Sequence, residues 1–300
     1  MTKTAWVFPG QGSQAVGMGI DLQDIPSAKA KIAIAQNILG WSVLDICQGN
    51  EQTLARTLYT QPCLYVIESI LVDLLAEKTG LPEIVAGHSL GEYVALYAAG
   101  VFDFESGLKL VKKRAELMDN AAGGKMAALM KFDRSELTLA LTDTDEVVLA
   151  NDNSEGQVVI SGTPDAVENI LDRVKAKRAM ILNVSGAFHS PLMQPAAEQF
   201  TEVLNLVSFK DARIPVVSNT DPTPTTDGQE LKQRLASQMT SSVRWREIML
   251  QLSQLKVTNV VEVGPGKVLC GLIKRTCRDM NLEAIATAEQ IDAKAAVLSS

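Results

Sequence analysis

The chain has 300 residues, of which 46% are apolar and 21% charged, and its formal charge is −7 at neutral pH. Such a chain can bury one large core with room for an inserted subdomain, which excludes a fibrous or disordered protein. The negative charge argues against a nucleic-acid partner. The N-terminus lacks an apolar run typical of a signal peptide, and polar residues interrupt the apolar stretches, so we expect a cytoplasmic protein without a membrane span.

Short apolar, β-rich runs alternate with segments of helical period along most of the chain. The runs expected to be strands are residues 5–8, 84–86, 215–218 and 257–263, and helical patterns fill the chain to about residue 80 and again to about residue 120. This alternation predicts an α/β fold with a parallel sheet flanked by helices.

The order of elements changes between residues 124 and 187. Strand, helix, strand, strand, helix and strand are expected at 125–131, 134–141, 147–151, 157–161, 164–176 and 179–184. This βαββαβ order is typical of a ferredoxin-like fold. We therefore predict a small subdomain at 124–187, inserted in a larger domain made of 1–123 and 188–300, and a polar tail after about residue 288.

Gly87, Ser89 and Gly91 fit the pattern G-x-S-x-G, which places a serine on a tight turn between a strand and a helix. Residues 84–86 have the apolar character of a buried strand, and apolar residues then recur every four positions until Gly100 ends the helix. We predict that Ser89 is a nucleophile at a helix N-terminus, where free N–H groups favour negative charge.

A serine nucleophile needs a base, and the chain contains two histidines. His88 directly precedes Ser89, so its side chain is expected to point away from the serine. His189 follows the last predicted strand of the subdomain, at the junction with the larger domain. We predict that His189 is the general base and acid.

Arg114 borders the apolar stripe of a predicted helix over 104–118. The residues one turn away are Leu110, Val111, Leu117 and Met118. No carboxylate one turn away can therefore pair with the guanidinium, and leaving it buried and unpaired costs roughly several kcal/mol. Either a distant acidic residue of the fold or a substrate carboxylate supplies the missing anion.

Together with further motifs, these residues resemble the malonyl-CoA:acyl-carrier-protein transacylases of dissociated fatty-acid synthesis, which also resemble acyltransferase domains of polyketide synthases. The matching segments are FPGQGSQ (8–14), TQP (60–62), GHSLGEY (87–93), the Arg114 helix, NS (153–154), GQVVISG (156–162), FHS (188–190) and EVGPG (262–266). They run the length of the chain and are highly specific as a set.

The resemblance implies an α/β-hydrolase-like large domain carrying a ferredoxin-like subdomain. It also implies that malonyl groups are taken from malonyl-CoA, held on Ser89 and delivered to acyl carrier protein. By similarity, His189 is the base, and Arg114 binds the malonyl carboxylate through two parallel hydrogen bonds. Nothing in the sequence demands a metal or a bound cofactor.

Further roles follow from the same resemblance. The backbone N–H groups of Gln11 and Leu90 are implied as the oxyanion hole, and Gln61 is expected to line the pocket. The backbone carbonyl of Gln238 is implied to orient the histidine, in place of a triad aspartate. Phe188 resembles the malonyl-selective form of its motif, in which a bulky ring excludes an α-methyl group.

Two basic clusters are candidates for docking the carrier protein, which is acidic in this family. One comprises Lys267, Lys274 and Arg275, with Arg278 close by in the sequence, and the other comprises Arg173, Lys175, Lys177 and Arg178. We expect the first cluster to contribute to docking, with the second as the alternative. The family suggests a monomer.

Four other functions share some of these sequence features. A nucleotide-binding dehydrogenase would use Gly10, Gly12 and Ala15 after the first strand, but no acidic residue occurs from 25 to 44 to bind the ribose. A thioesterase would not need Arg114, and a scaffold that binds carrier protein would not need Ser89. A transacylase of malonate decarboxylase or polyketide metabolism has similar chemistry, and the sequence does not separate it from fatty-acid synthesis.

Overall fold

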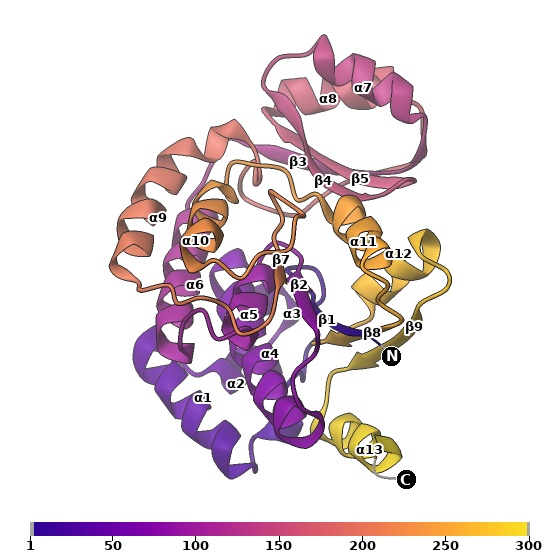
Figure 1. Ribbon diagram of the computed structural model, residues 1–300. Helices are drawn as coiled ribbons and strands as arrows, with labels where there is room; N and C mark the ends of the chain where they lie inside the picture. The colour runs from indigo at the N-terminus through magenta and orange to yellow at the C-terminus, as the bar shows by residue number, and fades with distance from the viewer. Residues whose placement is uncertain (1–2, 299–300) are drawn as a thin grey trace.

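The computed structural model describes residues 3–298, and its larger sheet runs through the middle of the molecule (Figure 1). Its strands are parallel and lie in the order β7-β2-β1-β8-β9. Their bounds are β1 (Thr4–Phe8), β2 (Ile84–Gly87), β7 (Val216–Val217), β8 (Asn259–Val263) and β9 (Asn281–Ile285). The predicted α/β fold with a parallel sheet is confirmed.

Helices flank this sheet and make up most of the larger unit. They are α1 (Pro26–Leu39), α2 (Val43–Gln48), α3 (Glu51–Leu54), α4 (Thr57–Thr79), α5 (Gly91–Ala98), α6 (Phe104–Asp119), α9 (Gln194–Leu206), α10 (Gly228–Ser237), α11 (Trp245–Gln254), α12 (Val268–Thr276) and α13 (Ala288–Leu298). Side-chain caps set several of their starts: Asp103 accepts a backbone N–H at the start of α6, and Asp227 does so for α10.

Alternate residues of β1 enter two different cores, as expected for a strand that is covered on both faces. Trp6 and Phe8 join the core formed with α4, α5 and α6, whereas Ala5 and Val7 join the core formed with α11 and α12. The carboxyl ends of the central strands are thereby held rigidly, and β2 leads directly into the predicted nucleophile turn.

Helix α4 is long and apolar enough to cross a membrane by length and composition. However, 83% of its most apolar window is buried inside the fold. Its side chains pack against α6 and α5, so its apolar character is that of a central core helix.

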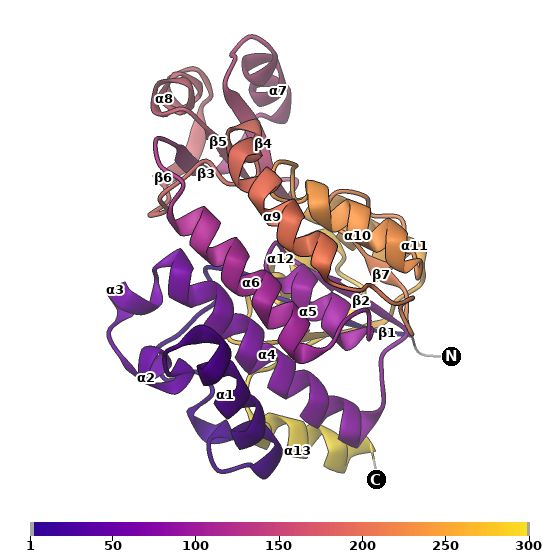
Figure 2. The ribbon, with the colours of Figure 1, turned by 90° about the vertical axis from the view of Figure 1, so that its left-hand side faces the viewer.

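A smaller antiparallel sheet stands at the top of the view in Figure 1, in the order β4-β5-β3-β6. Its elements are β3 (Lys125–Phe132), α7 (Arg134–Thr142), β4 (Val147–Ser154), β5 (Gln157–Gly162), α8 (Pro164–Arg173) and β6 (Ala176–Ile181). Leu129 and Ile160 point toward α7 and α8 and form a separate core with them. Figure 2 shows α6 and α9 running toward this sheet from the larger unit.

Backbone and side-chain contacts tie the two units together. The N–H of Val243 donates to the carbonyl of Ala150 on β4 (2.8 Å), and the carbonyl of Val243 accepts from the N–H of Asp152 (2.9 Å). The buried carboxylate of Asp152 pairs with Arg134 of the smaller unit and Arg246 of α11, at 2.7 and 3.0 Å. One strand of the smaller sheet is therefore anchored on the larger unit.

The structure differs from the sequence predictions at four elements. Helix α8 ends at Arg173 rather than at residue 176, and β6 begins at Ala176 because it pairs with β3 as far as Phe132. The strand β9 was not predicted. The segment after residue 288, predicted to be a tail, is the helix α13, and Ile291 is buried beneath it.

Candidate active site

Ser89 sits on a strained turn between β2 and α5. Its φ angle is 53°, a left-handed conformation that is uncommon for a residue other than glycine. A Cβ on Gly91 would lie 2.0 Å from the carbonyl oxygen of Phe8, so this tight turn requires glycine there. The side chain of Asn219 holds the turn: its Oδ1 accepts the N–H of Ser89 (2.7 Å), and its Nδ2 donates to the carbonyl of Gly87 (2.5 Å).

His189 lies directly against the serine, with 2.8 Å between Ser89 Oγ and His189 Nε2. Its other ring nitrogen, Nδ1, is 2.9 Å from the backbone carbonyl of Gln238. Because a carbonyl only accepts, Nδ1 carries the proton and Nε2 is free to accept the serine proton. Burial, and then the nearby charge of Arg114, lower the pKa of His189 to about 3, so the ring is neutral at physiological pH.

The second histidine is turned away from the serine, as the sequence predicts. His88 Nε2 is 2.7 Å from Asn153 Oδ1 on β4, and its ring packs near Trp245. Burial lowers the pKa of His88 as well. This side chain therefore joins the nucleophile turn to the smaller sheet.

Arg114 projects from α6 to the same point, although its side chain is only 1% exposed. Its Nη1 donates to Gln61 Oε1 (2.7 Å), and its Nη2 donates to Ser89 Oγ (3.0 Å) and Gln238 Oε1 (3.1 Å). Within residues 3–298, no carboxylate forms an ion pair with this guanidinium, and its Nε has no hydrogen-bond partner. A buried cation held by neutral amide oxygens thus lies beside the nucleophile.

Glu92 on α5 is a buried carboxyl whose charge acts on Arg114. Its Oε2 accepts from Gln238 Nε2 (2.6 Å), and the Gln238 amide therefore separates it from the guanidinium. Burial raises the pKa of Glu92, although the hydrogen bond from Gln238 opposes the shift. Burial also lowers the pKa of Arg114, and the neighbouring Tyr93 and Glu92 partly offset that effect.

A cavity of about 200 Å³ opens in front of Ser89 and is lined by both units of the chain. Gln61 and Phe188 belong to its wall, together with Met126 and Val159 from the inner face of the smaller sheet. Phe188 directly precedes His189 and is 5% exposed. The cavity therefore lies between the two sheets.

The loop after β1 lies against the nucleophile turn: a Cβ on Gly10 would be 2.5 Å from the carbonyl oxygen of His88. This approach places Gln11 in the wall of the cavity. In the described part of the chain, the backbone N–H groups of Gln11 and Leu90 have no hydrogen-bond acceptor. Both are thus available to a ligand oxygen near Ser89.

The first basic cluster lies on the same helix as part of the cavity wall. Lys267, Lys274 and Arg275 are exposed on and just before α12, whose residues Val268 and Leu269 line the cavity. Within residues 3–298, none of the three basic side chains forms an ion pair. The second cluster is also exposed, on α8 and β6.

Sequence reasoning missed Asn219, Glu92 and the side-chain role of Gln238. Asn219 follows the short strand β7, and residues at the carboxyl ends of parallel strands often form sites. Glu92 lies one turn after Ser89 on α5. The positions of Asn219 and Glu92 in the sequence were signals of a role at the site, but the residues that they contact are distant in the sequence. In the described residues, no group of three or more potential metal ligands occurs.

The chain matches known proteins over nearly its whole length. The acyl transferase domain family matches residues 5–298. A malonyl CoA-acyl carrier protein transacylase of Synechocystis sp. is 61% identical, covering 97% of this chain and 99% of its own length. One of Bacillus subtilis is 42% identical, covering 97% and 96%.

A solved structure is similarly close. The crystal structure of the Synechocystis malonyl-CoA:ACP transacylase superposes with a TM-score of 0.96 at 60% identity, covering 97% of this chain and all of that one. The chain therefore belongs to the acyl transferase domain family and, within it, to the malonyl CoA-acyl carrier protein transacylases.

Proposed function

We propose that the protein transfers malonyl groups from malonyl-CoA to the phosphopantetheine thiol of acyl carrier protein, through a malonyl ester on Ser89, and thereby supplies fatty-acid elongation. One observation carries the proposal. Ser89 Oγ lies 2.8 Å from the neutral base His189 and 3.0 Å from the buried guanidinium of Arg114, which lacks an anion. A nucleophile beside an unneutralised cation suits an acyl group that bears its own carboxylate.

The first half-reaction follows from the hydrogen-bond directions. Ser89 Oγ passes its proton to His189 Nε2 and attacks the thioester carbonyl carbon. The N–H groups of Gln11 and Leu90 stabilise the oxyanion that forms. When the carbon–sulfur bond breaks, the proton moves from His189 to the sulfur, and coenzyme A leaves as a thiol. The carbonyl of Gln238 keeps the imidazole oriented throughout.

The second half-reaction reverses these steps. A carrier-protein thiol gives its proton to His189, its sulfur attacks the malonyl ester, and Ser89 regains the proton as the carbon–oxygen bond breaks. Both substrate and product are thioesters, so transfer is nearly isoenergetic. The enclosed cavity must therefore keep water away from the ester between the two steps.

The basic cluster on α12 is the proposed docking surface for the acidic carrier protein. Lys267, Lys274 and Arg275 are exposed on and just before α12, which also contributes Val268, Leu269 and Leu272 to the cavity wall. A partner bound there brings a long flexible thiol arm to Ser89 without a change in the core. Arg173 of the alternative cluster already pairs with Asp143 (3.2 Å), which weakens that cluster as a docking surface.

We propose that 1–123 and 188–300 form an α/β-hydrolase-like domain and that 124–187 is a ferredoxin-like subdomain. The order β4-β5-β3-β6 and the βαββαβ succession support this division. We also propose a cytoplasmic monomer.

Replacing Arg114 with alanine tests the carboxylate role. Malonyl transfer should fall roughly 10- to 100-fold, the value of a lost charge-assisted contact, whereas use of acetyl-CoA should rise relative to malonyl-CoA. Arg114→Lys keeps the charge but loses the planar fork, so its rate of malonyl transfer should lie between those of wild type and Arg114→Ala. Steady-state rates with both thioesters check this. Unchanged malonyl transfer in Arg114→Ala, with no gain for acetyl-CoA, would show that Arg114 does not bind the acyl carboxylate.

A further inference from the structure

The loop 219–225 and the helix α10 each supply one support of the candidate active site. Asn219, at the start of the loop, holds the N–H of Ser89 and the carbonyl of Gly87. Gln238, directly after α10, holds His189 through its carbonyl and Arg114 through its side chain. The relative position of this loop and this helix therefore sets the geometry of the Ser89 backbone, His189 and Arg114.

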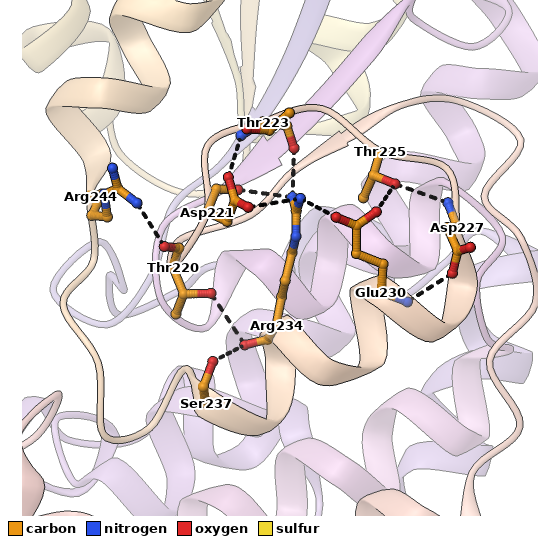
Figure 3. A network of polar contacts seen from close by, with 9 residues as sticks. All are labelled: Thr220, Asp221, Thr223, Thr225, Asp227, Glu230, Arg234, Ser237 and Arg244. Atoms are coloured by element: carbon orange, nitrogen blue, oxygen red, sulfur yellow. Dashed lines mark hydrogen bonds and ion pairs between the residues drawn. The ribbon is translucent and has the colours of Figure 1, made fainter.

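The guanidinium of Arg234 makes most of the contacts between the loop and the helix (Figure 3). Arg234 lies on α10 one turn before Gln238 and is only 7% exposed. Its Nη1 donates to the backbone carbonyls of Asp221 (3.0 Å) and Thr223 (2.5 Å). Its Nη2 pairs with the carboxylates of Asp221 (3.1 Å) and Glu230 (2.6 Å).

The residues that accept hydrogen bonds from Arg234 are themselves held by further hydrogen bonds. Asp221 Oδ1 accepts the N–H of Thr223 (2.9 Å), and this contact is the main cause of the lowered pKa of Asp221. Glu230 Oε2 accepts the hydroxyl of Thr225 (2.5 Å), which closes the far end of the loop onto the helix. The guanidinium thus lies at the centre of a satisfied network and not in a loose surface pair.

We propose that Arg234 is a positioning residue for transfer: it locks the loop that carries Asn219 onto the helix that leads to Gln238. It touches neither substrate nor reacting atoms, and it acts through Asn219 on the backbone of Ser89. Side chains that support a nucleophile must hold it to within about 0.5 Å, and a displacement of about 1 Å can lower a rate by about 100-fold. Nothing in the sequence pattern around Arg234 indicates this role.

The inference rests on the proposed function, and one assay separates the two. The rate constant for malonylation of Ser89 is measured in a single turnover with malonyl-CoA and no carrier protein, at a temperature where every variant is folded. If wild type forms no adduct, the proposed function fails. If wild type reacts and Arg234→Met reacts equally fast, the inference alone fails.

The expected result is that Arg234→Met lowers this rate constant by roughly tenfold and leaves the dependence on malonyl-CoA concentration nearly unchanged, because the substrate contacts remain. Arg234→Lys, which can pair with Glu230 but cannot span both backbone carbonyls, should recover only part of the rate. Arg234→Lys is also the test variant if Arg234→Met does not fold. Lys78→Met is the control, because it removes the ion pair with Asp292 between α4 and α13.

A double-mutant cycle tests the route of action. In an Asn219→Ala background the proposed target is absent, so Arg234→Met should change the rate less than about threefold. A full tenfold loss in that background would show that Arg234 does not act through Asn219. A purely structural role would lower the melting temperature in Arg234→Met and Lys78→Met alike, without slowing malonylation by the folded protein.

Discussion

The ring of Phe188 lies between the cavity and the backbone of Gly186, where an added Cβ would come within 3.2 Å of Cε1. The ring therefore cannot easily retreat to admit a larger acyl group. We predict that Phe188→Ala shifts the preference toward methylmalonyl-CoA over malonyl-CoA by about 10- to 200-fold, the effect of one methyl group in such a pocket. Competition between the two thioesters measures it. A preference unchanged within twofold would place the methyl-excluding group elsewhere.

At the same scale, local patterns located the central residues of the site but not their supports. The spacing of glycines around Ser89 predicts the tight turn, and the scarcity of histidines points to His189. The position of Asn219 after a strand was a signal, but its hydrogen bonds to the turn could not be predicted, because they span about 130 positions of sequence. Arg114 was left with two possible partners, and only the tertiary structure shows neutral amides around it.

Among the elements, most strands with strong apolar runs were predicted within two residues, although β4 ends three residues later than predicted. The weaker patterns of β6 and β9 were misplaced or missed. Ala176 and Ala179 are compatible with a helix, and they lie in β6 because that strand pairs with β3 across the sheet. The strand β9 has exposed and partly exposed residues at an edge, so its sequence lacks a buried pattern. Long-range strand pairing, which a local sequence pattern does not contain, determines where β6 and β9 form.

The helix α12 carries the docking prediction. Lys274→Glu combined with Arg275→Glu should raise the KM for acyl carrier protein by roughly tenfold at low salt, because charge attraction speeds the encounter. The KM for malonyl-CoA should stay unchanged, since neither residue lines the cavity. The matched control is Lys175→Glu with Lys177→Glu on the alternative cluster. Equal effects on both substrates, or a larger effect in the control, would contradict docking at α12.

For the molecule as a whole, the buried His189 makes stability depend on pH. Its folded pKa of about 3 lies below the value of about 6.5 for an unfolded chain, so between these values only the unfolded state binds the proton. The contribution of His189 to stability is therefore complete above about pH 6.5 and is lost as the pH falls toward 3. The buried Glu68 and Glu92, whose pKa values are raised, act in the opposite sense as the pH rises.

Comparison with His189→Gln isolates this effect, because His88 and the buried glutamates are present in both proteins. From pH 7 to pH 4.5, wild type should lose about 2 to 3 kcal/mol of unfolding free energy relative to His189→Gln. Urea unfolding at the two pH values measures the difference. An equal loss in both proteins would mean that the histidine accepts a proton in the folded state near its ordinary pKa.

The central claim concerns the covalent intermediate on Ser89. The protein is mixed with malonyl-CoA in the absence of carrier protein, and intact mass is followed by peptide mapping, with Ser89→Ala as the control. We predict one malonyl group on Ser89 that persists until a carrier-protein thiol is added and is absent from the control. Release of coenzyme A and free malonate without an adduct would contradict the account, because water would then be the acceptor.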